Sequence, residues 1–103
     1  MNDKVFKFDD VIHKKTRLMI LGLLLKEDEL SFSDLKEALN LTDGNLTSHL
    51  KILEINGIID VKKTFIGRRP KTFYKLTKEG KERFINYLNN VKDFLNFLIK
   101  KEE

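Results

Sequence analysis

Small polar side chains and a lysine lie along one side of a stretch near the middle of the chain, LTDGNLTSHLKILEING, from Leu41 to Gly57. Leu46, Leu50 and Leu53 recur at helical spacing and would form the buried side of a helix over 42–56. The other side carries residues that are small or can form hydrogen bonds, namely Gly44, Asn45, Thr47, Ser48 and Lys51. Such a surface can lie in the major groove of B-DNA, which is about 12 Å wide and accepts one α-helix.

The first turn of this stretch carries residues that begin a helix. Thr42 can act as the N-cap, and Asp43 suits the positive end of the helix dipole. The free backbone N–H groups of this turn, together with Thr42, can hold a phosphate. Asp43 could accept a hydrogen bond from cytosine N4 or simply support the capping turn, and we favour the second role. An isolated amphipathic helix is more often a solvated surface, so the case for DNA depends on what surrounds it.

A concentrated run of positive charge follows. Between Lys62 and Lys75 there are six basic residues and no acidic one: Lys62, Lys63, Arg68, Arg69, Lys71 and Lys75. Apolar and polar residues alternate in the segment that precedes GRRPK, as in a β-strand. Gly67 and Pro70 favour a turn, so we predict a β-hairpin with a basic tip over 65–72. A charge run can be only a solvated surface. Next to the polar helix we favour contacts with phosphates or the minor groove, made by Lys63, Arg68, Arg69 and Lys71.

Two helices are expected before the polar helix. The first should run from a cap at Asp9 or Asp10 to about Lys26, and the second should begin at an N-cap formed by Ser33. The second helix and the helix over 42–56 are joined by a short connection, so they would form a helix-turn-helix. The hairpin that follows would then be its wing.

The chain should close with a long helix. Thr77 is the expected cap of a helix from about Lys78 to Lys100, and Gly80 in its first turn suggests that another backbone segment lies close by. The predicted fold is therefore mainly α with a small β-hairpin, in a single domain over 1–103. A winged helix-turn-helix core would occupy about 10–76, and a C-terminal dimerisation helix would occupy 77–100.

The apolar residues of this last helix exceed what one small domain can cover. Phe84, Leu88, Val91, Leu95 and Leu98 follow one another at steps of 4, 3, 4 and 3, and Ile99 adds to the apolar surface. Packing against the first helix would use part of it. We expect the rest to form a symmetric interface between two copies, with help from the first helix and from Val5, Phe6 and Phe8. A two-fold dimer would place two recognition helices roughly 34 Å apart, which predicts an operator with an inverted repeat.

Composition excludes several other classes of function. A chain of 103 residues with a net charge of +4 and no cysteine has no disulfide and no thiolate metal site, and its two histidines alone cannot hold a metal. No phosphate-binding glycine loop, no catalytic triad and no paired carboxylates in an apolar setting occur, so we expect neither an enzyme nor a cofactor. The N-terminus lacks a signal-peptide pattern, and the longest apolar run, 18–25, is too short to span a membrane, so we expect a cytoplasmic protein.

Three blocks of the sequence resemble winged-helix regulators of the MarR/ArsR type. They are FDDVIHKKTRLMILGLL, LSFSDLKEALNLTDGNLTSHLKILEINGIIDVKKTF and GRRPKTFYKLTKEGKERF, and the similarity covers about 8–88. The resemblance implies a dimer that binds operator DNA through the third helix and the wing. By position it places Asp43, Gly44, Asn45, Thr47, Ser48 and Lys51 at the groove, and Arg68, Arg69 and Lys71 on the wing.

Two points of the resemblance stay open. His49 matches a frequent family residue, which either touches a phosphate or packs under the wing. The absence of cysteine removes the thiolate metal sensing of the arsenical-type members, and the chain has little room for an effector cleft. The alternative function is a winged-helix module that binds another protein, without specific DNA binding.

Overall fold

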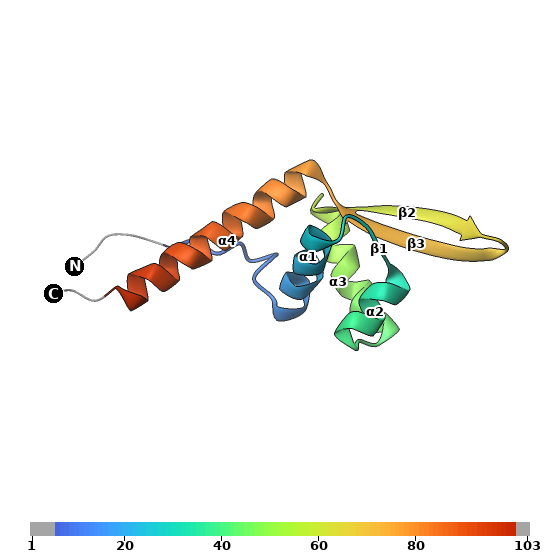
Figure 1. Cartoon of the computed structure of the whole chain (residues 1–103), viewed down its shortest axis with the longest axis horizontal. Helices are drawn as coiled ribbons and strands as arrows, with labels where there is room; N and C mark the ends of the chain where they lie inside the picture. Colours follow the sequence, from blue (N-terminus) through green and yellow to red (C-terminus); the bar gives the residue numbers. More distant parts are fainter. Residues whose placement is uncertain (1–5, 101–103) are drawn as a thin grey trace.

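The computed structural model describes residues 6–100. Its elements follow in the order α1 (Lys15–Lys26), β1 (Leu30–Ser31), α2 (Phe32–Leu39), α3 (Asp43–Ile55), β2 (Ile59–Ile66), β3 (Arg69–Leu76) and α4 (Lys78–Ile99) (Figure 1). The predicted order of three helices, a hairpin and a long last helix is confirmed. The short strand β1 was not predicted.

Aliphatic side chains from the first three helices meet in one core. Those without solvent exposure include Ile20 and Leu21 of α1, Leu35 of α2, and Leu46 and Leu53 of α3. Burial of each such side chain contributes roughly 1.5–3 kcal/mol. The three strands form an antiparallel sheet in the order β1-β3-β2 beside these helices. The predicted leucine side of α3 is therefore the side that holds it against the rest of the molecule.

The first helix begins later than the sequence suggested. Neither Asp9 nor Asp10 caps it; α1 starts at Lys15. Asp9 Oδ1 instead accepts hydrogen bonds from the backbone N–H groups of Val11 and Ile12, at 3.0 and 3.3 Å. The carboxylate thus caps a separate turn, and the chain changes direction before α1 begins.

The second helix begins earlier than predicted, because its cap is Ser31 rather than Ser33. Ser31 Oγ accepts from the N–H of Asp34, and the Asp34 carboxylate accepts from the N–H of Ser31, each at 3.0 Å. This reciprocal capping box satisfies two N–H groups of the first turn. Ser31 is held extended because β1 pairs with β3, opposite Phe73.

The beginning of α4 fits closely against the segment that follows α3, as Gly80 suggested. Thr77 Oγ1 accepts from the N–H of Gly80 at 2.8 Å, which confirms Thr77 as the cap. A Cβ at Gly80 would lie less than 3.0 Å from three backbone atoms of Ile58. Gly57 ends the preceding segment in the left-handed region, with φ of 72°. Glycine is therefore required at 80 by space and favoured at 57 by backbone conformation.

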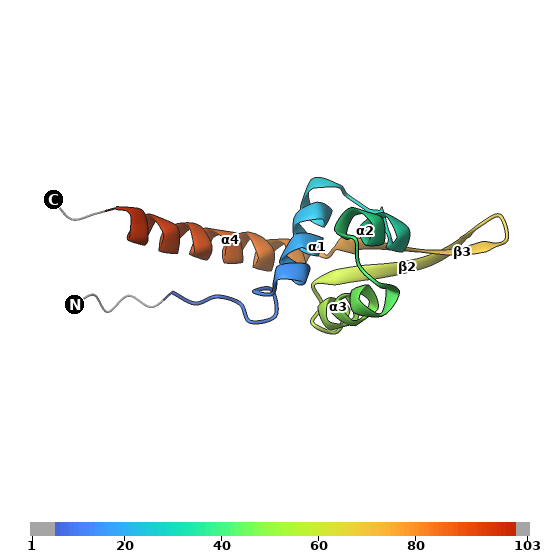
Figure 2. The ribbon, with the colours of Figure 1, turned by 90° about the horizontal axis from the view of Figure 1, so that it is seen from below.

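The wing and α4 extend from opposite ends of the helical core, as Figures 1 and 2 show, so the molecule measures 65 × 26 × 21 Å. The segment 6–13 runs back along α4. Phe6 packs against Phe94 and Phe97 with ring centroids 5.2 and 5.3 Å away, and Phe8 packs against Phe94 at 5.6 Å. Phe6 and Phe8, expected at an interface between copies, thus contact α4 of their own chain; Val5 lies outside the described residues.

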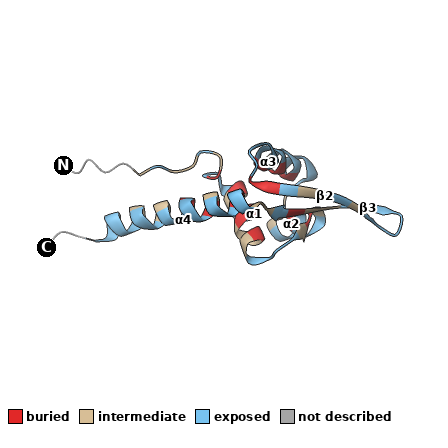
Figure 3. Cartoon of the chain, turned by 90° about the horizontal axis from the view of Figure 1, so that it is seen from above, coloured by how far each residue is buried: buried red, intermediate tan, exposed pale blue. Residues whose placement is uncertain are grey.

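The residues predicted for the dimer interface separate into two groups. Phe84 is 1% exposed and stacks on Tyr87, so it belongs to the core and offers no surface to a partner. Val91 is partly buried against the same core. Figure 3 shows that the outer half of α4 is largely exposed. Four of the six predicted residues are exposed, namely Leu88, Leu95, Leu98 and Ile99.

Candidate nucleic-acid interface

The polar side of α3 is open to solvent. Thr42 caps the helix by accepting from the backbone N–H of Asn45 at 3.1 Å, and the Asn45 residue is exposed. Ser48 Oγ donates to the carbonyl of Gly44 at 2.9 Å, one turn earlier. This bond uses the Ser48 proton, so the hydroxyl faces the solvent as an acceptor. All the residues predicted for the groove except His49 are exposed: Thr42, Asp43, Gly44, Asn45, Thr47, Ser48 and Lys51.

Asp43 has a partner that the sequence did not suggest. Lys36 Nζ of α2 lies 2.7 Å from Asp43 Oδ1, and both side chains are exposed. The ion pair joins the two helices of the helix-turn-helix at its surface. It also places a positive charge beside the one carboxylate of the first turn of α3, which reduces repulsion toward an anionic ligand. The side-chain cap of α3 is Thr42, and Asp43 follows it in the first turn of the helix.

The wing is longer and its turn tighter than the predicted tip. β2 and β3 pair from Ile59 and Leu76 to Ile66 and Arg69, so only Gly67 and Arg68 form the turn. Gly67 has φ of 64°, as tight hairpin turns require. Arg69 and Lys71, which the sequence placed near a loop tip, lie on strand β3.

The basic residues of the wing lie on two faces. Side chains alternate along a strand, so Lys63 shares a face with Val61 and Tyr74, and Lys71 lies on the opposite face. On the first face a hollow of about 250 Å³ lies between wing and recognition helix, lined by Thr47, Leu50, Lys51, Glu54, Val61, Lys63 and Tyr74. The sequence separates Lys51 from Lys63, and the structure brings them to one surface.

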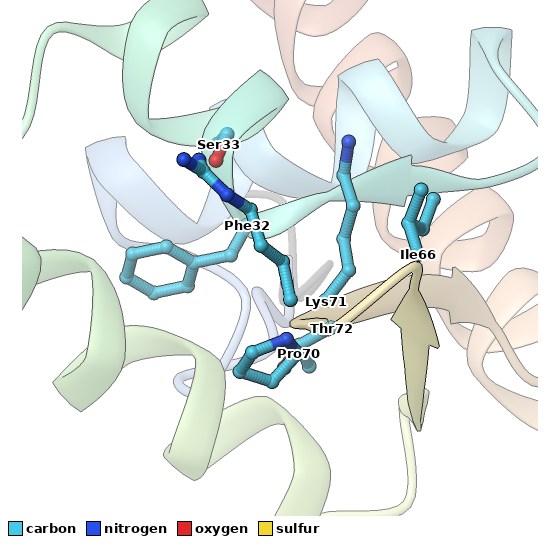
Figure 4. A pocket seen from close by; sticks show the side chains of 7 residues that line it. Phe32, Ser33, Ile66, Pro70, Lys71 and Thr72 are labelled. Atoms are coloured by element: carbon cyan, nitrogen blue, oxygen red, sulfur yellow. The ribbon is translucent and has the colours of Figure 1, made fainter.

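On the second face, the wing meets the start of α2. A hollow of about 410 Å³ is lined by Phe32, Ser33, Ile66, Arg69, Pro70, Lys71 and Thr72 (Figure 4). The pKa of the nearby Asp34 carboxyl is lowered, first by the hydrogen bonds from Ser31 and in smaller part by the charge of Lys71. Arg69 and Lys71 therefore line a different hollow from Thr47, Lys51 and Lys63.

His49 lies at the other edge of α3. Thr47 and Lys51 face the wing, whereas His49 lies across the buried leucines from them, on the side of α1. Burial, and then the charge of Arg17 on α1, lower the pKa of the His49 imidazole. His49 is not among the residues that line the hollow between α3 and the wing, and Arg17 is a residue that the sequence analysis overlooked.

Other kinds of site are not found in the part of the chain that the structure describes. Residues 6–100 contain no group of three or more histidine, cysteine, aspartate or glutamate side chains that could hold a metal. Within the same residues, no helix is long and apolar enough to cross a membrane.

Known proteins are similar to this chain in sequence and in fold. Residues 16–95 match the family described as winged helix DNA-binding domain. The chain is 43% identical over 81 residues to an uncharacterized protein of Methanocaldococcus jannaschii, which covers 79% of this chain and 88% of that protein. It is 37% identical over 73 residues to the uncharacterized HTH-type transcriptional regulator YdgJ of Bacillus subtilis, covering 67% of this chain and 42% of YdgJ. The chain thus matches less than half the length of YdgJ.

Solved structures give the same result. A transcriptional regulator homologue from Pyrococcus horikoshii superimposes with a TM-score of 0.83 at 33% identity, over 89% of this chain and 91% of that one. MarR superimposes with a TM-score of 0.73 at 18% identity, over 86% of this chain and 64% of MarR, and so shows the fold alone. The chain therefore belongs to the winged helix DNA-binding domain family, a family of regulators rather than enzymes, and has the fold of MarR-type transcriptional regulators.

Proposed function

We propose that the protein is a dimeric transcriptional regulator that reads an inverted-repeat operator. The helix over 42–56 enters the major groove, and the basic wing over 65–72 contacts the backbone or the minor groove. The whole chain acts as one domain, with the core over about 10–76 and the helix over 77–100 joining the copies. On this proposal the protein acts in the cytoplasm and requires no cofactor.

The arrangement of α3 and β2 carries the proposal. Thr47, Lys51 and Lys63 line one hollow, next to a helix side whose groove-facing residues are exposed. Amide and hydroxyl groups such as those of Asn45 and Ser48 can bond to base edges, whereas Lys63 and Arg68 supply charge for phosphates. The recognition helix and the adjacent wing thus combine groups suited to reading sequence with groups suited to binding the backbone.

An open apolar stripe on α4 supports the dimer. Ile85 is 41% exposed, Leu95 48% and Leu98 56%, and Leu88 and Ile99 continue the same side of the helix. The segment 6–13 covers a different side of α4, so this stripe stays uncovered by the rest of residues 6–100. A symmetric pair of α4 helices would bury it and set the two recognition helices roughly one DNA turn apart.

A protein-binding module is the second candidate, because the wing ends in apolar side chains. Phe65 is 70% exposed and Ile66 58%, next to the turn. A wing that only contacts phosphates does not need either residue. A stable dimer that ignores duplex DNA at low salt would favour this candidate.

Selection of bound sites from random duplexes is the experiment that tests the proposed function. Bound sequences should share two half-sites related by a two-fold axis. Asn45→Ala should then cost roughly 1–3 kcal/mol on the selected site and much less on random DNA. Arg68→Ala should weaken binding to both and reduce the slope of log affinity against log salt by about 1. Equal losses on both duplexes for Asn45→Ala, or no enriched sequence, would contradict sequence reading.

A further inference from the structure

The first turn of α1 has unsatisfied hydrogen-bond donors and no acidic residue. Lys14 is the N-cap residue and its side chain forms no capping bond, and the first turn holds no aspartate or glutamate. The first bond into this end runs from the N–H of Leu18 to the carbonyl of Lys14, at 2.7 Å. Within residues 6–100, the N–H groups of 15–17 therefore have no acceptor. A helix end of this kind attracts an anion, but on its own it does not identify a site.

Two buried nitrogen atoms beside this turn point to a ligand. Among the described residues, only Arg17 Nε and His49 Nδ1 are buried side-chain nitrogens or oxygens without a hydrogen-bond partner. Arg17 is 7% exposed and forms no ion pair within 6–100. Arg17 belongs to the same first turn as the free N–H groups, and long side chains of a helix lie back over the preceding turn. A buried donor without an acceptor, such as Arg17 Nε, is costly, and an anion would provide the missing acceptor.

The position of the turn indicates which anion fits. A hollow of about 230 Å³ is lined by Lys15, Thr16, Met19, Leu39 and Leu41, which places the start of α1 beside the residue that precedes Thr42. Figure 1 shows that α1 and α3 both begin at the lower side of the helical core. The start of α1 thus lies on the surface that presents the start of α3.

A recognition helix in the major groove has a sugar–phosphate strand on each side. The wing lies beyond one edge of α3, where Thr47 and Lys51 face Lys63. The start of α1 lies beyond the other edge, next to His49, whose imidazole is within electrostatic range of Arg17. The two edges of α3 are therefore each flanked by positive charge, as two phosphate strands would require.

We propose that the first turn of α1 binds a backbone phosphate of duplex DNA on the side of the recognition helix away from the wing. The N–H groups of 15–17 and the Thr16 hydroxyl donate to its oxygens, Lys14 and Lys15 supply exposed charge, and Arg17 supplies charge from beneath. This site rests on the proposed function and extends its footprint by one backbone contact per copy.

Salt-dependent binding to the selected duplex tests this site. Lys15→Gln should reduce the log–log slope by about 1, so that its loss of affinity between 50 and 200 mM salt is about 3.5-fold smaller than that of the wild type. Lys26→Gln is the matched control, because Lys26 is an exposed lysine at the opposite end of the same helix. It should leave the slope unchanged. An unchanged slope for Lys15→Gln would overturn the site.

Neutralised phosphates locate the contact on the DNA. Each test duplex carries a single uncharged methylphosphonate in place of one phosphate. At one position per half-site, outside the wing's contacts, this replacement should lower the affinity of the wild type but cause little further loss in Lys15→Gln. Arg17→Lys should retain binding better than Arg17→Met; thermal unfolding of both shows whether the fold is kept, and the Lys15→Gln result stands if it is not. If the losses of binding free energy from Lys15→Gln and from the methylphosphonate add at every position, the contact is contradicted.

Two further outcomes distinguish a DNA phosphate at α1 from a general loss of DNA binding and from a free anion. If the wild type binds no duplex, the proposed function fails. If Arg68→Ala reduces the slope and Lys15→Gln does not, only the α1 site fails. Inorganic phosphate, titrated without DNA while the amide NMR signals of 15–17 are followed, should shift them only weakly at millimolar concentration. Saturation at micromolar phosphate would indicate a site for a free anion and overturn the assignment to DNA.

Discussion

The carboxylate of Asp9 accepts two hydrogen bonds from the guanidinium of Arg83, a residue 74 positions away on α4. The bond from Nη2 to Oδ1 is 3.0 Å long, and Nε donates to Oδ2. Paired contacts between two planar groups are stronger and more directional than a single ion pair. The same carboxylate caps the turn before α1, so it fixes the N-terminal segment to α4 and to the core together.

Replacing Asp9 by asparagine should therefore destabilise the fold. The pKa of Asp9 is lowered chiefly by the hydrogen bond from Arg83. We expect Asp9→Asn to lower the free energy of unfolding by about 1 kcal/mol at neutral pH, a low value for a charged hydrogen bond because Arg83 is partly solvated. Denaturant unfolding would measure this. Asp10→Asn, at an exposed neighbouring position, should have almost no effect.

The difference in the free energy of unfolding between the wild type and Asp9→Asn should also disappear in acid. Because the folded pKa of Asp9 lies below 3.8, its stabilising contribution is complete above that pH and is lost as the pH falls through the lower value. Wild type and Asp9→Asn should thus converge in stability at strongly acid pH. A difference that stayed constant from neutral pH to acid would contradict the ion pair.

Two glycines in helices should respond to alanine in opposite directions. Gly80 has no room for a Cβ beside the backbone of Ile58, so Gly80→Ala should cost about 3 kcal/mol despite the better helix propensity of alanine. Gly22 in α1 has no atom within 4 Å of the same position, so Gly22→Ala should stabilise by about 0.5–1 kcal/mol. Thermal unfolding of both variants would measure the difference. Equal effects would mean that α4 can shift away from Ile58.

His49 should make stability depend on pH in the mildly acidic range. The unfolded chain takes up a proton near pH 6.5, whereas burial and Arg17 lower the pKa of the folded imidazole. The unfolded state therefore binds more protons, and the free energy of unfolding should fall as the pH drops below about 6.5. His49→Gln should flatten this part of the profile, measured by denaturant unfolding at several pH values.

The second histidine offers a control for that profile. His13 Nδ1 shares a hydrogen bond of 2.7 Å with the hydroxyl of Tyr87 on α4. His13→Gln should keep the fall in stability that His49→Gln removes. Asp9 and Asp34 do not interfere, since both pKa values lie below 3.8. A profile that is flat in the wild type would show that His49 is hydrated in the folded protein.

Local sequence patterns predicted most of the fold because local physics decides it. The leucine spacing of α3 and the caps at Thr42 and Thr77 depend on neighbouring residues only, and all three are confirmed. The cap of α2 was wrong because Ser31 and Ser33 are equally good caps locally. Pairing of β1 with β3 holds Ser31 extended and decides between them. Asp9 was misplaced for the same reason, since its distant partner Arg83 is not visible in the local sequence.

The sequence located the candidate surface but not its faces. It selected the polar side of α3 and the basic wing, yet it could not tell that Lys63 faces α3 while Lys71 faces α2. That difference depends on how the strands pair. It also missed Lys36 and Arg17, because a lysine on a helix and an arginine in an apolar run have no distinguishing local pattern. Phe84 was assigned to the dimer because heptad spacing does not show which chain covers a residue.

The open stripe of α4 leads to a prediction about assembly. Leu95 is 48% exposed on the apolar side of the helix that the segment 6–13 leaves uncovered. A charge there would have to be buried between two copies, so Leu95→Glu should convert a dimer into a monomer at micromolar concentration. Analytical ultracentrifugation would measure the mass. Because a monomer holds only one half-site, affinity for the selected inverted repeat should fall with the dimer, while affinity for random DNA should fall less.

Asn89→Glu tests whether position or charge causes that loss. Asn89 is exposed on a polar side of the same helix, together with Asn86 and Asp93. Asn89→Glu introduces the same charged side chain into the same helix, but outside the apolar stripe. It should therefore leave the mass and the operator affinity unchanged. If both variants stay dimeric, the copies associate through another surface. If both become monomers, added charge alone disrupts α4, and the stripe is not the reason. An interface on the leucine side is supported only if Leu95→Glu is a folded monomer and Asn89→Glu is a folded dimer.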